Sequence, residues 1–150
     1  MSRGAQYCVK LFLFMLMSSN SQIIEFPKIS DPRGNLTFFE NSSQIPFEIK
    51  RVFWIYDVPS GETRGGHAYH EQEEIIIALS GSFDVVLTNS DGEFIKVNLS
   101  RPNYGIYLSP KTWRHMENFS TNSVALHISS KIFTEEDYIR DFESFKSIVN

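Results

Sequence analysis

Residues 61–81 read GETRGGHAYHEQEEIIIALSG, a glycine-rich loop that leads into an apolar strand. Polar side chains recur along it at fixed intervals: His67 stands six positions after the first glycine, Tyr69 two positions further, and Glu74 five positions after that. The glycines before His67 allow the backbone to approach a ligand closely. In a strand, His67 and Tyr69 project to the same face. The stretch therefore predicts a core strand that carries part of a site.

A second block, GIYLSPKTWRHMEN at residues 105–118, places a proline turn at Pro110 and a histidine five residues later at His115. Together the two blocks resemble the paired motifs of the cupin fold, in the order that the fold requires. Tyr69 stands where the first cupin motif usually has a second histidine. The pair is much more specific than either block alone.

Length and charge narrow the classes of protein. A chain of 150 residues is one ordinary domain with room for a proper core. The formal net charge is −4, and 14 scattered Lys and Arg cannot form a basic face, so we expect no nucleic-acid partner. Aromatic residues make up 14% of the chain, and these large rings suit a β-barrel core. The single cysteine, Cys8, excludes an intrachain disulfide and fits a cytoplasmic location.

Residues 1–20, MSRGAQYCVKLFLFMLMSSN, do not look like part of the core. The first interpretation is that the start of the chain is assigned too far upstream and that the natural start lies near Met15 or Met17. A targeting segment and a folded N-terminal strand are the alternatives. The apolar run is too short for a transmembrane helix, which needs roughly 20 residues, so no membrane partner is expected. We predict a single domain over residues 21–150.

From residue 23 the chain shows short β-branched and aromatic runs separated by turn residues, a pattern that indicates a β-sandwich or barrel. Asp91-Gly92 is the clearest hairpin signal. The predicted strands are Ile23–Phe26, Leu36–Glu40, Lys50–Asp57, Glu73–Ser80, Ser82–Asn89, Phe94–Leu99, Tyr104–Leu108 and Val124–Ser129. After them, a capping-box pattern beginning at Thr134 predicts one C-terminal helix with an inward stripe of Tyr138, Phe142, Phe145 and Val149.

His67 and Tyr69 are the candidate catalytic residues. A buried histidine with one open side acts as a base near neutral pH. The Tyr69 phenol either donates a proton, holds a developing oxyanion, or simply fills volume. Glu74 joins the site only if a bulge or turn intervenes, and it is otherwise a solvent-facing carboxylate.

The expected substrate-binding residues are mainly cations and aromatics. An acidic protein that binds a phosphate-bearing ligand must supply its own forked donors. Tyr107 is expected to face the interior, while His70 and His127 are interpreted as structural or exposed. The predicted substrate-binding set is Arg51, Arg64, Tyr107, Trp113, Arg114 and His115.

Four segments carry a closer family resemblance that covers Ile23 to Ile148. They are RVFWIYD, RGGHAY with the strand and SGSFDVVL after it, GIYLSPKTW, and FTEEDYIRDFESFK. The chain resembles the cupin-type nucleotide-sugar 3,4-ketoisomerases, WxcM-like proteins that act on dTDP-4-keto-6-deoxyglucose. The resemblance implies an all-β, RmlC-like jelly-roll barrel with one C-terminal helix. It also implies a homodimer, commonly with exchanged N-terminal strands.

The activity that this resemblance implies is an isomerisation without metal or cofactor, on a dTDP-linked keto sugar. A base removes the proton next to the ketone, an enediol(ate) forms, and a proton returns to the neighbouring carbon. In the family a His-Ala-His pair carries this step; here His67 keeps the first histidine and Tyr69 replaces the second. The family also commonly has histidine directly after tryptophan, where this chain has Arg114.

Two other hypotheses remain open from the sequence. The first is a metal-dependent cupin that uses His67, Glu74 and His115 as ligands, since two histidines and a carboxylate form a known open metal site. The second is a sugar-nucleotide-binding protein that has lost catalysis together with the second histidine. The hexose and the direction of isomerisation depend on the shape of the pocket.

Overall fold

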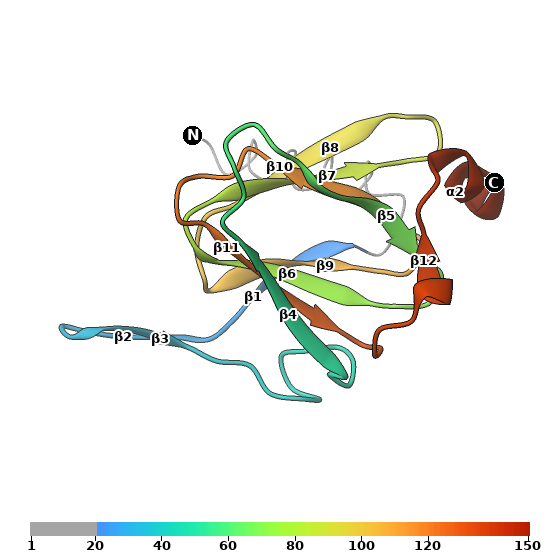
Figure 1. Cartoon of the computed structure of the whole chain (residues 1–150). Coiled ribbons are helices and arrows are strands. Elements are labelled where there is room, and N and C mark those ends of the chain that lie inside the picture. Colours follow the sequence, from blue (N-terminus) through green and yellow to red (C-terminus); the bar gives the residue numbers. More distant parts are fainter. Residues whose placement is uncertain (1–20) are drawn as a thin grey trace, which may run out of the picture.

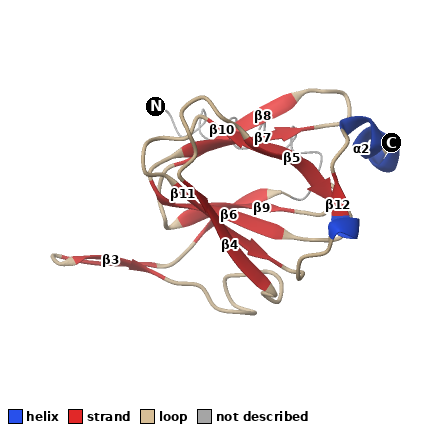
Figure 2. Cartoon of the chain, viewed as in Figure 1, coloured by secondary structure: helices blue, strands red, loops and turns tan. Residues whose placement is uncertain are grey.

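Two antiparallel five-stranded sheets face each other in the computed structural model, which describes residues 21–150 (Figures 1 and 2). The first sheet has the order β1 (Gln22–Glu25), β9 (Tyr104–Leu108), β6 (Glu74–Ser80), β11 (Val124–Ser129) and β4 (Arg51–Tyr56). The second has the order β12 (Tyr138–Ile139), β5 (Arg64–Tyr69), β10 (Trp113–Glu117), β7 (Phe83–Thr88) and β8 (Phe94–Leu99). The predicted all-β double-sheet fold is thereby confirmed. The interpretation of residues 1–20 lies outside the described residues.

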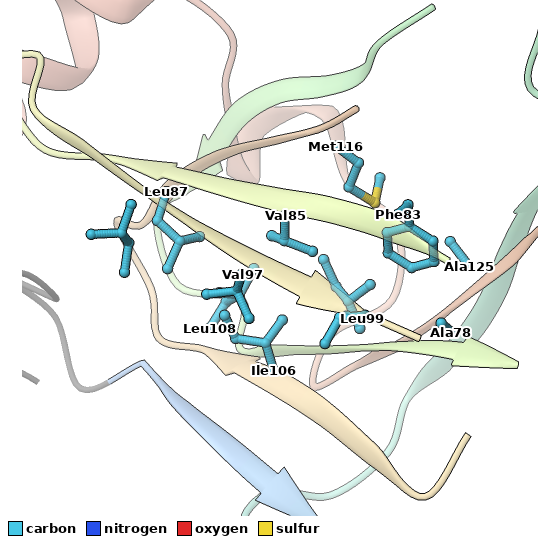
Figure 3. Close-up of a cluster of buried hydrophobic side chains, with 12 residues drawn as sticks. Ala78, Phe83, Val85, Leu87, Val97, Leu99, Ile106, Leu108, Met116 and Ala125 are labelled. Carbon is cyan, nitrogen blue, oxygen red and sulfur yellow. The ribbon is translucent and has the colours of Figure 1, made fainter. Parts of the chain in front are cut away.

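The space between the sheets is filled at one end by apolar side chains. Successive side chains of a strand point to opposite faces, so alternate residues of both sheets meet in the interior. Figure 3 shows this cluster, which packs Phe83 and Val85 of β7 against Leu99 of β8 and Ile106 of β9. All four side chains are buried. This core holds the sheets together and leaves the other end of the barrel for polar residues.

The first sheet is buried on its outer face as well. Ile75 and Ile77 of β6 point away from the interior and pack with Phe26, Ile45 and Phe47, which belong to the N-terminal segment that crosses beneath the sheet. Burial on both faces explains why β6 reads as a continuous apolar run, since neither set of alternate residues meets water.

The hairpin between β7 and β8 forms at the predicted Asp91-Gly92 turn. Asn89 Oδ1 accepts hydrogen bonds from the backbone N–H groups of Asp91 and Glu93. Gly92 has a φ of 85°, a left-handed value that glycine adopts without steric cost. A second hairpin, β2 (Lys28–Asp31) with β3 (Gly34–Thr37), projects away from the barrel (Figure 1).

The C-terminal segment differs from its prediction. The expected helix from Thr134 is divided: Glu135–Asp137 form one 3₁₀ turn, β12 pairs with β5, and only α2 (Phe142–Val149) is α-helical. Thr134 makes no side-chain cap, whereas Asp141 caps α2 by accepting from the Ser144 N–H. Of the predicted inward stripe, Phe145 is buried on the outer face of the second sheet, but Val149 is exposed.

β10 also lies outside the predicted strands, because Thr-Trp-Arg-His-Met has few β-branched residues and no simple alternation of apolar and polar residues.

The helices of the described segment, residues 21–150, include none long and apolar enough to cross a membrane.

Candidate active site

A cavity of about 470 Å³ occupies the polar end of the space between the sheets. Its walls come from both sheets, with His67 and Tyr69 on β5, Arg114 on β10, Glu74 on β6 and His127 on β11. β6, β10 and β11 also contribute residues to the apolar core, and β5 is held by pairing with β10. The cavity therefore gathers these ionisable side chains from both sheets.

His67 reaches the cavity because the chain before it is distorted. β5 pairs with β10 through Arg114 opposite His67, but the register shifts between Arg114 and His115, which lies opposite Gly65. Gly65 has a φ of 92°, and a Cβ atom there would lie 3.3 Å from the His115 Cα atom. The glycines of RGGHAY thus allow β5 to lie close against β10 at the bulge.

The His67 imidazole is held neutral. Its Nε2 atom is buried and makes no hydrogen bond to any of the described residues. Burial first, and the Arg114 guanidinium second, lower the pKa of His67 to about 3. The imidazole therefore presents an unprotonated nitrogen to the cavity, where it can accept a proton from a bound molecule.

Tyr69 lies beside His67 and is held by rings on several sides. The His67 and Tyr69 rings meet edge to face with centroids 5.0 Å apart, and the Arg114 guanidinium stands 4.3 Å over the Tyr69 ring. The Tyr69 hydroxyl donates a hydrogen bond to the Tyr138 hydroxyl at 3.2 Å. Burial raises the pKa of Tyr69, and the Glu74 carboxylate adds to the rise. Tyr69 is accordingly a protonated phenol, a hydrogen-bond donor.

Glu74 and Arg114 form a buried ion pair across the cavity. Arg114 Nη2 donates to Glu74 Oε2 at 2.5 Å, and both side chains are almost completely buried. Arg114 Nη1 also donates to the His67 carbonyl oxygen at 2.9 Å. Burial on its own would raise the pKa of Glu74, but Arg114 and His127 together outweigh it and lower the pKa to about 2. Glu74 is therefore a carboxylate at any physiological pH.

His127 takes the other carboxylate oxygen. Its Nδ1 atom lies 3.0 Å from Glu74 Oε1, and its ring stacks on Phe53 of the neighbouring strand with centroids 4.5 Å apart. Only 3% of the residue is exposed. The Nε2 atom is buried and has no partner within residues 21–150. The site therefore holds a second imidazole with a free nitrogen, on the wall opposite His67.

Of the other cationic residues predicted to bind substrate, Arg64 and His115 line the cavity and Arg51 does not. Arg64 is exposed at the mouth of the cavity, and part of His115 lines it, although His115 Nε2 lies 3.4 Å from Glu117 Oε2. Arg51 donates to Gln72 Oε1 at 3.3 Å and stacks on Phe53, without lining the cavity.

Two aromatic residues of the predicted set face other surroundings. Tyr107 was expected to face the interior, but it lies on the outer face of the first sheet, where it packs near Phe47 and donates to Glu73 Oε2. The reason is alternation, because its neighbours Ile106 and Leu108 already occupy the inward positions. Trp113 packs on Phe142 and Phe145, between β10 and α2.

The metal hypothesis required His67, Glu74 and His115 to converge. The structure does not bring them together, because both Glu74 oxygens are engaged by Arg114 and His127, and His115 turns toward Glu117. Across residues 21–150, no three histidine, cysteine or acidic side chains are arranged to hold a metal ion.

Three polar lining residues, His127, Tyr138 and Arg140, were not predicted from the sequence, and the position of Glu74 was left open. A turn between β5 and β6 does intervene and places Glu74 on the opposite sheet. Alternation along VALHIS was the available signal for His127, since Leu126 and Ile128 face outward and His127 must face inward. Tyr138 had no such signal, because it was assigned to a helix.

These features define a class: a double-sheet barrel with a buried acid–base cavity between its sheets. The comparisons with known proteins then give the family. Residues 19–150 match the family model described as "FdtA: WxcM-like, C-terminal". The chain belongs to this family, as its sequence motifs predicted.

Two relatives and one more distant structure place it further. The chain is 38% identical over 130 residues to the TDP-4-oxo-6-deoxy-alpha-D-glucose-3,4-oxoisomerase of Aneurinibacillus thermoaerophilus, covering 86% of this chain and 92% of that one. The structure of QdtA, a sugar 3,4-ketoisomerase from Thermoanaerobacterium thermosaccharolyticum in complex with TDP, is 36% identical with a TM-score of 0.85, covering 88% and 96% of the two chains. The RmlC epimerase of Mycobacterium tuberculosis, at 17% identity and a TM-score of 0.71 over 83% and 70%, shares the fold alone. The expected RmlC-like fold is confirmed.

Proposed function

We propose that this chain is a TDP-sugar 3,4-ketoisomerase that acts on TDP-4-keto-6-deoxyglucose or a close relative of it. The observation that carries the proposal is His67, a neutral imidazole whose free Nε2 atom lies buried in the cavity of a protein that belongs to this family. The relatives named above act on, or bind, TDP-linked compounds. Their identity to this chain extends over almost the whole domain.

The residues suit the chemistry of an enediolate. His67 takes the proton from the sugar carbon next to the ketone, and charge develops on the ketone oxygen. The Tyr69 phenol, which its raised pKa keeps protonated, turns its O–H from Tyr138 to that oxygen and donates a hydrogen bond to it. The buried cavity strengthens this hydrogen bond and keeps water from the intermediate. Arg114 fixes both residues by stacking on Tyr69 and bonding the His67 carbonyl.

The nucleotide diphosphate is expected at the mouth of the cavity. A second hollow of about 440 Å³ adjoins it, lined by Trp54 and Tyr56. Arg64 lines both hollows and is exposed between them. Its guanidinium offers the forked donors that phosphate groups require in a protein of net negative charge.

The test is incubation with TDP-4-keto-6-deoxyglucose in deuterated water, followed by NMR. The wild type should incorporate deuterium into the sugar and form the 3-keto isomer. His67→Asn should lower turnover by about 10²-fold or more, the usual contribution of a general base. The control is His70→Asn, because His70 is exposed and does not line the cavity. Binding of TDP without exchange by the wild type would favour the non-catalytic binding protein instead.

We also propose that the active form is a homodimer. The projecting β2–β3 hairpin exposes Ile29 and Leu36, and the edge strand β4 exposes Val52. Unpaired sheet edges and contiguous apolar surfaces are normally covered. Because one chain supplies both surfaces, a second copy related by twofold symmetry covers both at once.

Light scattering after size-exclusion chromatography tests the dimer. We expect twice the chain mass for the wild type and a monomer for the double variant Ile29→Asp, Leu36→Asp. Phe94→Asp is the matched control, since Phe94 is equally exposed but lies on β8 of the other sheet. A monomeric wild type at micromolar concentration would contradict the proposal.

A further inference from the structure

His127 lines the cavity, and the mechanism above leaves it unused. It lies on β11 of the first sheet, whereas His67 lies on β5 of the second, so the two imidazoles line one cavity from opposed walls. His127 is buried and His67 is half-buried, and each presents a buried Nε2 atom that no other residue of the described segment engages. A buried imidazole nitrogen without a partner is costly unless something else bonds it. The cavity is where that partner binds.

Glu74 prepares His127 for proton transfer. The Glu74 carboxylate accepts from Nδ1 at 3.0 Å, which fixes the ring and leaves Nε2 as the nitrogen that gains and loses a proton. A carboxylate in this position also stabilises the imidazolium that forms when Nε2 is protonated. Phe53 supports the ring from one face at 4.5 Å. Arg114 uses the other carboxylate oxygen and so does not compete for the same atom.

We propose that His127 is the second acid–base residue of the isomerisation, donating to C4 the proton that completes the reaction after His67 has removed the proton from C3. The inference rests on the proposed function and adds a residue to it. His127 supplies the imidazole that the cavity lacks at position 69, from a different strand and the opposite wall.

One turnover moves a proton off C3 and another onto C4, with no net oxidation or reduction. The C3–H bond breaks, its proton goes to His67 Nε2, and its electron pair forms the C3=C4 bond while the C4 carbonyl electrons move to the oxygen. That oxygen takes up the proton which the C3 hydroxyl loses as its ketone forms. C4 receives a proton from protonated His127 Nε2. After the turnover, His67 releases its proton to solvent and His127 takes up a proton from solvent.

Tyr69 is less suited to this second transfer. Its phenol keeps its proton tightly, since burial raises its pKa. A strongly held proton stabilises an oxyanion by hydrogen bonding but is transferred to carbon slowly. The two roles therefore separate, with Tyr69 at an oxygen and His127 at a carbon.

The experiment measures two rates in deuterated water with TDP-4-keto-6-deoxyglucose: loss of the C3 proton signal and formation of the 3-keto product. His127→Gln should lower product formation by about 10²-fold or more and keep C3 exchange within about threefold of wild type. His67→Asn should lose both rates together. His70→Gln, the same substitution at an exposed histidine, should change neither.

A second variant guards against a folding defect. Glu74→Gln keeps a hydrogen-bond acceptor for His127 but removes the charge, so it should also slow product formation more than exchange, with far-ultraviolet circular dichroism reporting on its fold. Equal loss of exchange and product in His127→Gln, or turnover within threefold of wild type, would overturn the role of His127 while leaving the ketoisomerase function intact. A wild type that shows neither rate would instead remove the proposed function and this inference with it.

Discussion

The Tyr69 hydroxyl is the group whose contribution can be isolated most cleanly. Tyr69→Phe removes one oxygen atom and keeps the ring that Arg114 and His67 pack against. If the phenol holds the enediolate oxygen, kcat should fall by about 10²–10³-fold, the usual cost of removing one oxyanion donor, with little change in KM. Steady-state kinetics with the TDP-keto sugar measures both constants. An unchanged kcat would mean that the ring only fills volume.

At this scale the motif spacing predicted His67, Tyr69 and Arg114 as part of one site, and all three line the cavity. The prediction that Tyr107 faces the interior is wrong, because spacing alone cannot fix which face of a strand is inward. That choice depends on the neighbours: the strand must bury Ile106 and Leu108 in the core, which turns Tyr107 outward. His127 was open to the same reasoning, but a lone histidine in an apolar strand is usually structural.

Among the elements, the short β12 strand pairs with β5, and the carboxylate just before it adds a second attachment to the barrel. Asp137 Oδ1 and Oδ2 accept hydrogen bonds from the backbone N–H groups of Glu71 and Gln72, at 2.9 and 3.1 Å. These two hydrogen bonds hold Asp137 in place, and the next residue, Tyr138, packs against the rings of His67 and Tyr69. Asp137→Ala should therefore destabilise the fold by about 2–3 kcal/mol, because two N–H donors lose a charged acceptor. It should also lower kcat.

Asp141→Ala is the matched control for Asp137→Ala. Asp141 caps α2 through the Ser144 N–H, on the far side of the second sheet from the cavity. Its loss should cost about 1 kcal/mol of stability and leave kcat unchanged. Urea unfolding and kinetics on both variants test the pair. A normal kcat for Asp137→Ala would show that β12 does not position Tyr138 for the reaction.

The sequence pattern located most strands because alternation and turn residues are local signals. β8, β9 and β11 begin and end where the sequence predicted. The C-terminal segment was harder, since the acidic residues after Thr134 look the same in a capping box as in a loop whose Asp137 caps a distant backbone. Only the tertiary contact between Asp137 and the β5–β6 turn distinguishes the two. β10 is specified likewise by pairing with β5 and β7.

For the whole molecule, the ionisable groups at the polar end of the barrel make the free energy of unfolding depend on pH. In the folded protein, burial and then the Arg114 guanidinium lower the pKa of His67 from 6.5 to about 3. Burial would raise the pKa of Glu74, but Arg114 and His127 outweigh it and lower that pKa from 4.5 to about 2. Both groups bind protons more readily when unfolded. Their stabilisation is therefore complete above pH 6.5 and is lost as the pH falls.

The two groups act over different ranges of pH, so a variant can separate them. Between pH 6.5 and about 3, His67 should contribute a decline in the free energy of unfolding of up to about 1.4 kcal/mol per pH unit, the value for one proton. Glu74 should add a second decline between pH 4.5 and about 2. In His67→Asn the first decline should disappear and the second should remain, whereas the exposed His70→Asn should keep both. Urea unfolding from pH 7.5 to 3 measures these slopes. An undiminished slope between pH 6 and 5 in His67→Asn would show that the folded protein does not hold His67 neutral, and the base of the proposed reaction would have to be sought elsewhere in the cavity.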